Sequence, residues 1–269
     1  MKRKSSAHMA SAQTGQAPWR TACWAVLCGV VAATIVFAPA AWLARGLHAV
    51  TDGRLLLADA QGSVWHGSAQ LLLTGGEGAQ DAVSLPGRLD WTLRPSWLGL
   101  QMALHMPCCT AEPVQLAFQP GWGQSTAGVL PAKIYLPAQW LTGLGAPWNT
   151  LDPQGQLALS SQALQIQWSQ GRMRMEGQLT LDMMAMSSRL STLSPLGDYR
   201  LMLSGGNVPT LSLQTLQGAL KLSGSGQVVG SRIRFSGEAS TSAEQLDALS
   251  NVLNIIGRRQ GSKSLISLG

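Results

Sequence analysis

Apolar residues follow two patterns along this chain: one unbroken run near the N-terminus, and many short alternating segments after it. The run over residues 22–43 contains no charged residue and lies between Arg20 and Arg45. Its length matches the roughly 20 apolar residues that cross a hydrocarbon core. Trp24 and Trp42 lie near its two ends, where aromatic side chains favour the membrane interface. The pattern predicts a transmembrane helix over residues 22–43.

The charges before this run predict its orientation. Four basic residues and no acidic residue precede it: Lys2, Arg3, Lys4 and Arg20. By the positive-inside rule, residues 1–21 form a cytoplasmic tail and the chain after the run lies outside the cytoplasm. A cleaved signal peptide is the alternative. The run is longer than a typical signal-peptide apolar region and ends in a poor cleavage site, which favours an uncleaved anchor.

Alternation of apolar and polar residues predicts β-strands after the anchor. In residues 172–183 a methionine, leucine or glycine alternates strictly with a polar side chain, so one face is buried and the other is wet. The same rhythm recurs in residues 157–159, 164–168, 199–203, 220–222 and 233–235. Turn signals stand at residues 152–155, 169–171, 205–207 and 224–226. Strands at this spacing, with one polar face, favour an antiparallel meander over parallel strands.

The first half of the exported part is less regular. Residues 54–58, 63–73 and 85–93 are predicted as strands, and a proline-rich middle that interrupts strand pairing follows them. We place a boundary near residue 150, between a β region over residues 44–150 and a second over residues 151–269. A bend within one extended sheet fits the same pattern, because no linker separates the halves.

One helix is predicted outside the membrane, at about residues 242–257. Ser242 and Gln245 can form a capping box, and Gly257 supplies a stop. Its apolar residues form one stripe: Leu246, Leu249, Val252, Leu253 and Ile256. This stripe either packs on the sheet or binds a partner. The predicted fold is thus mainly β, an extended antiparallel sheet with a C-terminal helix behind one transmembrane helix.

Charge and cysteine content narrow the class of protein. The chain has 19 basic and 13 acidic residues, a net charge of +6. Four of the basic residues precede the anchor, so most of the positive charge reflects membrane orientation rather than a basic surface on the exported part. The net charge is weak evidence for a nucleic-acid partner, and none is predicted. Cys23 and Cys28 lie inside the predicted span. Cys108 and Cys109 are the only cysteines outside it, so in an oxidising compartment they pair with each other or with another chain, or remain free thiols.

No residue pattern indicates catalysis. The four histidines, at positions 8, 48, 66 and 105, have no metal-ligand or nucleophile spacing. A zinc site from His105, Cys108 and Cys109 lacks a nearby fourth ligand. Neither a phosphate-binding glycine loop nor a Gly-x-Ser-x-Gly elbow followed by histidine is present. The sequence therefore predicts a protein that is not an enzyme, with no catalytic residue, metal or cofactor.

Several segments, taken in order, resemble the type II secretion system protein N family. They are residues 62–69, 89–95, 196–201, 218–227, 232–239 and 253–259. The resemblance implies a single-pass inner-membrane accessory or assembly component, mostly periplasmic, of the machine that moves folded proteins across the outer membrane. Its implied partners are other subunits of that machine and the inner membrane.

The exported part also looks similar to lipid-handling proteins of the AsmA type, whose long curved sheets make an apolar trough. This likeness implies an alternative function, as an envelope protein that binds or transfers phospholipid. Two surfaces are predicted to contact partners. One is the region of Trp65, Trp91 and Trp97, and the other is the helix stripe of Leu246, Leu249, Val252, Leu253 and Ile256.

Overall fold

The described part of the chain divides after Ala38 into two compact units. The computed structural model describes residues 19–76, 78–79, 81–169, 171–230 and 232–269. Most of the predicted cytoplasmic tail, with Lys2, Arg3 and Lys4, lies outside the described residues. The first unit contains helix α1 (Trp19–Val36), and all other described elements belong to the second unit.

The predicted helix over residues 22–43 is not continuous. Helix α1 ends at Val36 and helix α2 (Ala40–Val50) begins after Pro39. Pro39 is extended, with φ −71° and ψ 147°. A proline also keeps the residue before it out of the helical region, so the helix breaks here. Within the described part of the chain, no helix combines the length and apolar character needed to cross a membrane.

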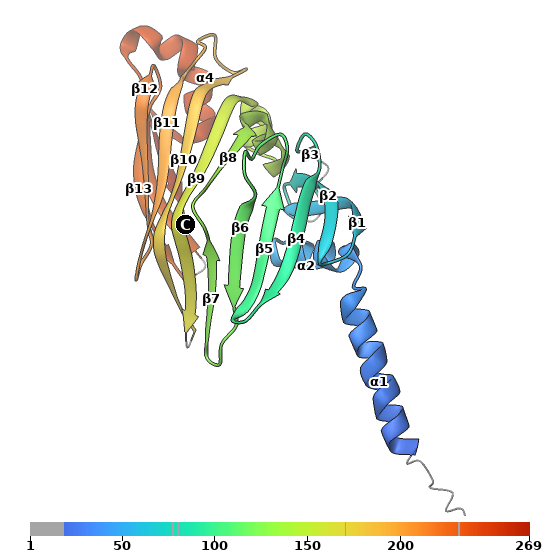
Figure 1. The fold of residues 1–269 in the computed structure, drawn as a ribbon. Coiled ribbons are helices and arrows are strands. Elements are labelled where there is room, and N and C mark those ends of the chain that lie inside the picture. Colours follow the sequence, from blue (N-terminus) through green and yellow to red (C-terminus); the bar gives the residue numbers. More distant parts are fainter. Residues whose placement is uncertain (1–18, 77, 80, 170, 231) are drawn as a thin grey trace, which may run out of the picture. The chain divides into compact units, whose positions relative to one another are not determined.

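The second unit is built on one 16-stranded sheet whose paired strands are all antiparallel, which confirms the prediction of a mainly β fold (Figure 1). Its N-terminal strands are β1 (Leu55–Gly62), β2 (His66–Thr74), β3 (Ala82–Ser84), β4 (Leu89–Ser96), β5 (Gly99–His105), β6 (Val114–Gln119), β7 (Gln124–Val129) and β8 (Ala132–Pro137). Its C-terminal strands are β9 (Pro153–Ser169), β10 (Arg172–Ser188), β11 (Gly197–Gly206), β12 (Thr210–Gly218), β13 (Lys221–Val229), β14 (Arg232–Ser240), β15 (Arg258–Gln260) and β16 (Lys263–Leu268).

Strand pairing continues across residue 150. Strand β9 pairs with β8 along its first half and with β7 along its second half, so it joins the two parts of the sheet. Short helices η1 (Ala138–Leu144) and α3 (Trp148–Leu151) connect β8 to β9. The predicted boundary falls in α3, and the division into two β regions remains a prediction.

The predicted C-terminal helix is confirmed as α4 (Leu246–Ile256), preceded by the single turn η2 (Ala243–Gln245). The Ser242 side chain makes no capping hydrogen bond, so the predicted capping box does not form. Gly257 ends the helix in an extended conformation, where β16 lies close beside the chain. A methyl group on Gly257 would lie 2.3 Å from the Leu265 carbonyl oxygen.

Two predicted turns are wrong, and their residues lie in strands instead. Residues 224–226 lie inside β13, where Gly224 is opposite Gly237 of β14. A methyl group on Gly224 would lie 2.4 Å from Phe235 Cζ, so these glycines make room for an aromatic ring rather than a turn. Pro153 and Gly155 likewise begin β9. The proline-rich middle also forms regular strands, with Pro95 within β4.

Candidate functional site: a partly covered apolar face

The sheet has one apolar face, because side chains alternate along each strand and the register places apolar residues of neighbouring strands opposite one another. Aligned pairs include Trp91 with Leu104, Leu116 with Val129, Ile166 with Ala127, Leu201 with Leu213, and Leu203 with Leu211. The opposite face carries serine, glutamine and charged residues. We call the end of the sheet that bears α4 the upper end, and the other end the lower end (Figure 1).

The upper part of the apolar face is a closed core. Leu249, Val252 and Leu253 of α4 are almost fully buried and pack in one cluster with Leu157 and Tyr199 of the sheet. A second cluster lies under η1, where the Trp140 indole N–H donates to the Val83 carbonyl at 3.2 Å. Half-buried Leu136 packs against both clusters, so the covered region is continuous.

The lower part of the same face is not covered by the described residues. Phe118, Trp168, Ile233 and Leu268 are 41%, 42%, 49% and 60% exposed, and none belongs to a core cluster. We call the apolar residues of this region the lower face: Leu116, Phe118, Ile166, Trp168, Leu211, Val228, Ile233, Phe235 and Leu268. A sheet that exposes apolar side chains in a row offers a contact surface for another apolar molecule.

The lower corner of the sheet is hollowed. A shallow groove of about 630 Å³ is lined by residues of β12, β13, β14 and β16, including Leu211, Phe235 and Leu268. A second hollow, of about 600 Å³, lies where the end of α2 meets β1 and η1, and most of its lining is apolar, as at Val50 and Trp140. Both are open, so each is a surface depression rather than an enclosed ligand site.

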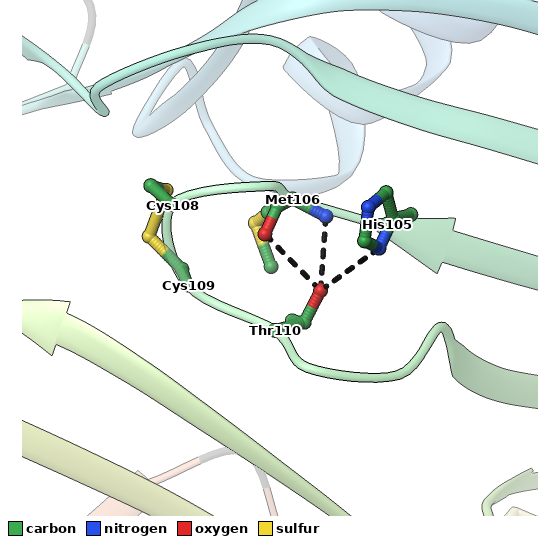
Figure 2. Close-up of a disulfide and its surroundings, with 5 residues drawn as sticks. All are labelled: His105, Met106, Cys108, Cys109 and Thr110. Carbon is green, nitrogen blue, oxygen red and sulfur yellow. Dashed lines mark hydrogen bonds between the residues drawn. A yellow bond between two sulfur atoms is a disulfide. The ribbon is translucent and has the colours of Figure 1, made fainter.

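Cys108 and Cys109 form a disulfide with each other in the β5–β6 connection (Figure 2). Cys109 is buried in the cluster under η1, and Cys108 is exposed. The turn is held from within, since the Met106 carbonyl accepts hydrogen bonds from the Cys109 and Thr110 amides at 2.8 and 2.9 Å. The Tyr135 amide of β8 donates to the Cys109 carbonyl at 2.8 Å. The sequence left the pairing of these cysteines open, and the structure places them in one ring.

His105 lies beside this disulfide but does not complete a metal site. Its Nδ1 shares a hydrogen bond of 3.3 Å with the Thr110 hydroxyl, which also accepts from the Met106 amide (Figure 2). Both cysteine sulfurs are engaged in the disulfide. Within the described residues, no group of three or more His, Cys, Asp or Glu side chains could hold a metal ion.

The predicted interaction residues divide between core and surface. Trp91 is buried in a small cluster with Ala40 and Ala69, and its indole N–H donates to the Val64 carbonyl at 3.1 Å. Leu249, Val252 and Leu253 belong to the core under α4, so these four side chains are not accessible to a partner. Half-buried residues of the two predicted surfaces are Trp65, Leu246 and Ile256. Trp97 is fully exposed, and a surface around Trp65 and Trp97 remains a prediction.

Charged pairs lie on the polar face and at its margin, away from the lower face. Arg200 donates to the Asp182 carboxylate through two nitrogens, at 2.6 and 3.0 Å, and this contact raises the pKa of Arg200. The hydrogen bond from Arg88 lowers the pKa of Asp59, helped by a second one from Gln61. These pairs tie neighbouring elements together.

One buried hydroxyl lies in the core itself. The Tyr199 hydroxyl donates to the Leu220 carbonyl at 3.1 Å, and burial, aided by the neighbouring Asp198 carboxylate, raises the pKa of Tyr199 well above its usual value. The hydroxyl therefore stays protonated and keeps its hydrogen bond over the physiological pH range.

Sequence reasoning named Trp97 but missed two other exposed aromatic residues of the lower end, Trp122 and Trp168. Trp122 lies in the β6–β7 turn and Trp168 near the β9–β10 turn. A signal was present for Trp122, because Pro120, Gly121 and Gly123 around it mark a turn, and a turn tryptophan has no sheet face to pack against.

The profile of the family described as type II secretion system (T2SS), protein N matches residues 53–265. The chain belongs to the type II secretion system protein N family. The match extends from just before β1 into β16, so it covers nearly the whole sheet and confirms the resemblance predicted from the sequence. As a protein N family member, the chain takes part in type II secretion together with other subunits of that envelope system. Comparison with curated protein sequences and with solved structures gave no match.

Proposed function

We propose that this protein is a non-enzymatic accessory subunit that assists assembly of the type II secretion system at the inner membrane. The observation that carries the proposal is the family match over residues 53–265, which coincides with the sheet unit. The absence from the sequence of a nucleophile elbow or a phosphate-binding loop agrees with an assembly role rather than a catalytic one.

In this proposal the N-terminal segment anchors the protein in the inner membrane, with its tail in the cytoplasm and its sheet in the periplasm. Support comes from the uncharged run over residues 22–43, from the basic residues before it, and from α1, whose apolar side chains, such as Trp24, Val26 and Leu27, are exposed. A disulfide between Cys108 and Cys109 agrees with an oxidising compartment.

In-cell photocrosslinking tests the assembly role. A photoreactive residue replaces Phe118 or Ile233 on the lower face, and Gln214 or Ser223 on the polar face serves as a matched control. Crosslinks to other secretion subunits, together with loss of exoprotein secretion when the gene is deleted, are the expected result. Normal secretion and no subunit adduct from any of the four positions would refute the assembly role.

The lower face supports a second candidate function, in which the protein binds or transfers phospholipid in the envelope. Apolar side chains that remain uncovered along one face of a long sheet provide a surface for acyl chains, as in a lipid trough. The same crosslinked samples separate the two functions. Phospholipid adducts at Phe118 and Ile233, absent at Gln214 and without subunit adducts, would favour lipid handling over assembly.

A further inference from the structure

The hairpin turns at the lower end of the sheet form one row. The β4–β5, β6–β7, β9–β10, β11–β12 and β13–β14 hairpins all turn at this end, because the chain meanders from strand to strand. The register brings the turns side by side: Leu100 of β5 is opposite Phe118 of β6, and Gln124 of β7 is opposite Ser169 of β9. The first three turns of the row are visible at the lower end in Figure 1. With about 4.8 Å between strands, the row extends for roughly 40 Å.

Large apolar side chains protrude from these turns. Trp97 and Trp122, in the β4–β5 and β6–β7 turns, are 104% and 107% exposed, so nothing in the described chain packs against them. Leu98 and Val208 continue the series in the β4–β5 and β11–β12 turns, and Val229 ends β13 next to the β13–β14 turn; all three are exposed. Large apolar side chains that are exposed together on one surface mark an interaction site, so the arrangement points to a ligand surface.

The charge around the row is almost entirely positive. Exposed arginines flank three of the turns: Arg94, Arg172, Arg174, Arg232 and Arg234. Glu176 is the one acidic residue on the adjoining strand ends, and it pairs with Arg174 at 3.2 Å. Within the described part of the chain, the other four arginines make no ion pair with a carboxylate. Their charge is therefore available to an anionic partner.

We propose that this row of turns binds the surface of an anionic phospholipid bilayer. Tryptophan prefers the depth of the headgroups, where its ring is buried and its N–H stays hydrated. Arginines on the strand ends beside three of these turns meet the lipid phosphates, and each basic residue near an anionic surface strengthens binding about fivefold. Tryptophan and arginine also suit a protein partner, but a row of separate hairpins that extends for roughly 40 Å, with almost no acidic residue beside it, matches the anionic surface of a bilayer. This inference does not depend on the secretion role.

The test uses the full chain reconstituted in vesicles and measures the surroundings of single labelled positions. Cys23 and Cys28 are replaced by alanine, and an environment-sensitive fluorophore is attached at Leu98→Cys, beside Trp97. Thr192→Cys, exposed in the β10–β11 connection at the upper end, is the matched control. The vesicles are phosphatidylglycerol with phosphatidylcholine, or phosphatidylcholine alone, and brominated lipids serve as quenchers.

The expected result is a blue shift and lipid quenching at position 98 in the anionic vesicles, with neither at position 192. Arg172→Gln with Arg232→Gln should lower the equilibrium constant for lipid contact about fivefold per arginine at low salt. Trp97→Ser with Trp122→Ser should lower it without removing its salt dependence. Equal spectra at positions 98 and 192 would overturn the proposal. So would a blue shift at position 98 without quenching by the brominated lipids, which would indicate contact with a second copy, or one that requires added secretion subunits.

Discussion

Leu253 provides a direct test of whether α4 belongs to the core or to a partner surface. The Leu253 side chain is fully buried between α4 and the sheet. Leu253→Ala removes three buried carbons, a loss of about 2.4 kcal/mol in transfer free energy. The cavity that remains brings the expected destabilisation to about 3 kcal/mol or more. For a unit of this size, the melting temperature should fall by roughly 6–12 °C.

The assay is thermal unfolding of the full chain in mild detergent, followed by circular dichroism of the strands. Ile255→Ala is the matched control, because Ile255 lies on the same helix with its side chain exposed, and we expect it to cost less than about 1 kcal/mol. The core assignment is refuted if the two variants melt alike while Leu253→Ala alone lowers recovery of other secretion subunits. That outcome would restore the helix stripe as an interaction surface.

Three further predictions concern the core, the sheet and the disulfide. Tyr199→Phe should cost about 1 kcal/mol at neutral pH. Folding raises the pKa of Tyr199, so its contribution to the free energy of unfolding should be complete below about pH 10 and be lost above it. Melting curves at alkaline pH should therefore show a larger loss of stability in the unmodified protein than in Tyr199→Phe, and Tyr135→Phe is the control. Gly224→Ala should destabilise the sheet by about 1–3 kcal/mol, and Phe235→Leu should recover part of that loss in a double-mutant cycle measured by urea unfolding. Peptide mapping without reduction should give a peptide containing Cys108 and Cys109 that lacks the mass of two hydrogens, and alkylation of both cysteines before reduction would contradict the disulfide.

Period-two alternation predicted the antiparallel strands of the C-terminal half, because their apolar and polar side chains alternate; β5 to β8, in the proline-rich middle, were not predicted. The segment of residues 172–183 is accordingly the first part of β10, and the stripe of α4 was visible for the same reason. Glycine misled the prediction at residues 224–226. The sequence alone does not distinguish a glycine needed for a positive φ from one that makes room for a ring on the neighbouring strand.

The candidate site was less predictable, because exposure depends on where covering elements end. Trp91 and Trp97 belong to the same strand-and-turn segment, yet one is buried under α2 and the other protrudes at the turn. Alternation assigns a side chain to a face but not to the covered or uncovered part of that face. The lower face and the row of turns therefore emerge only when register and helix positions are known.

The meander has a consequence for how disturbances spread through the molecule. Apart from the junction at β9, nearly every strand pairs only with its neighbours in the chain order. Stability then resembles that of a repeat array, as a sum of local terms with nearest-neighbour coupling. A hairpin at the lower end can open and close again while the closed core under α4 persists. Because each hairpin contacts mainly its neighbours, whole hairpins can be added to or removed from a sheet of this kind. The width of the sheet can then change while the core under α4 stays the same.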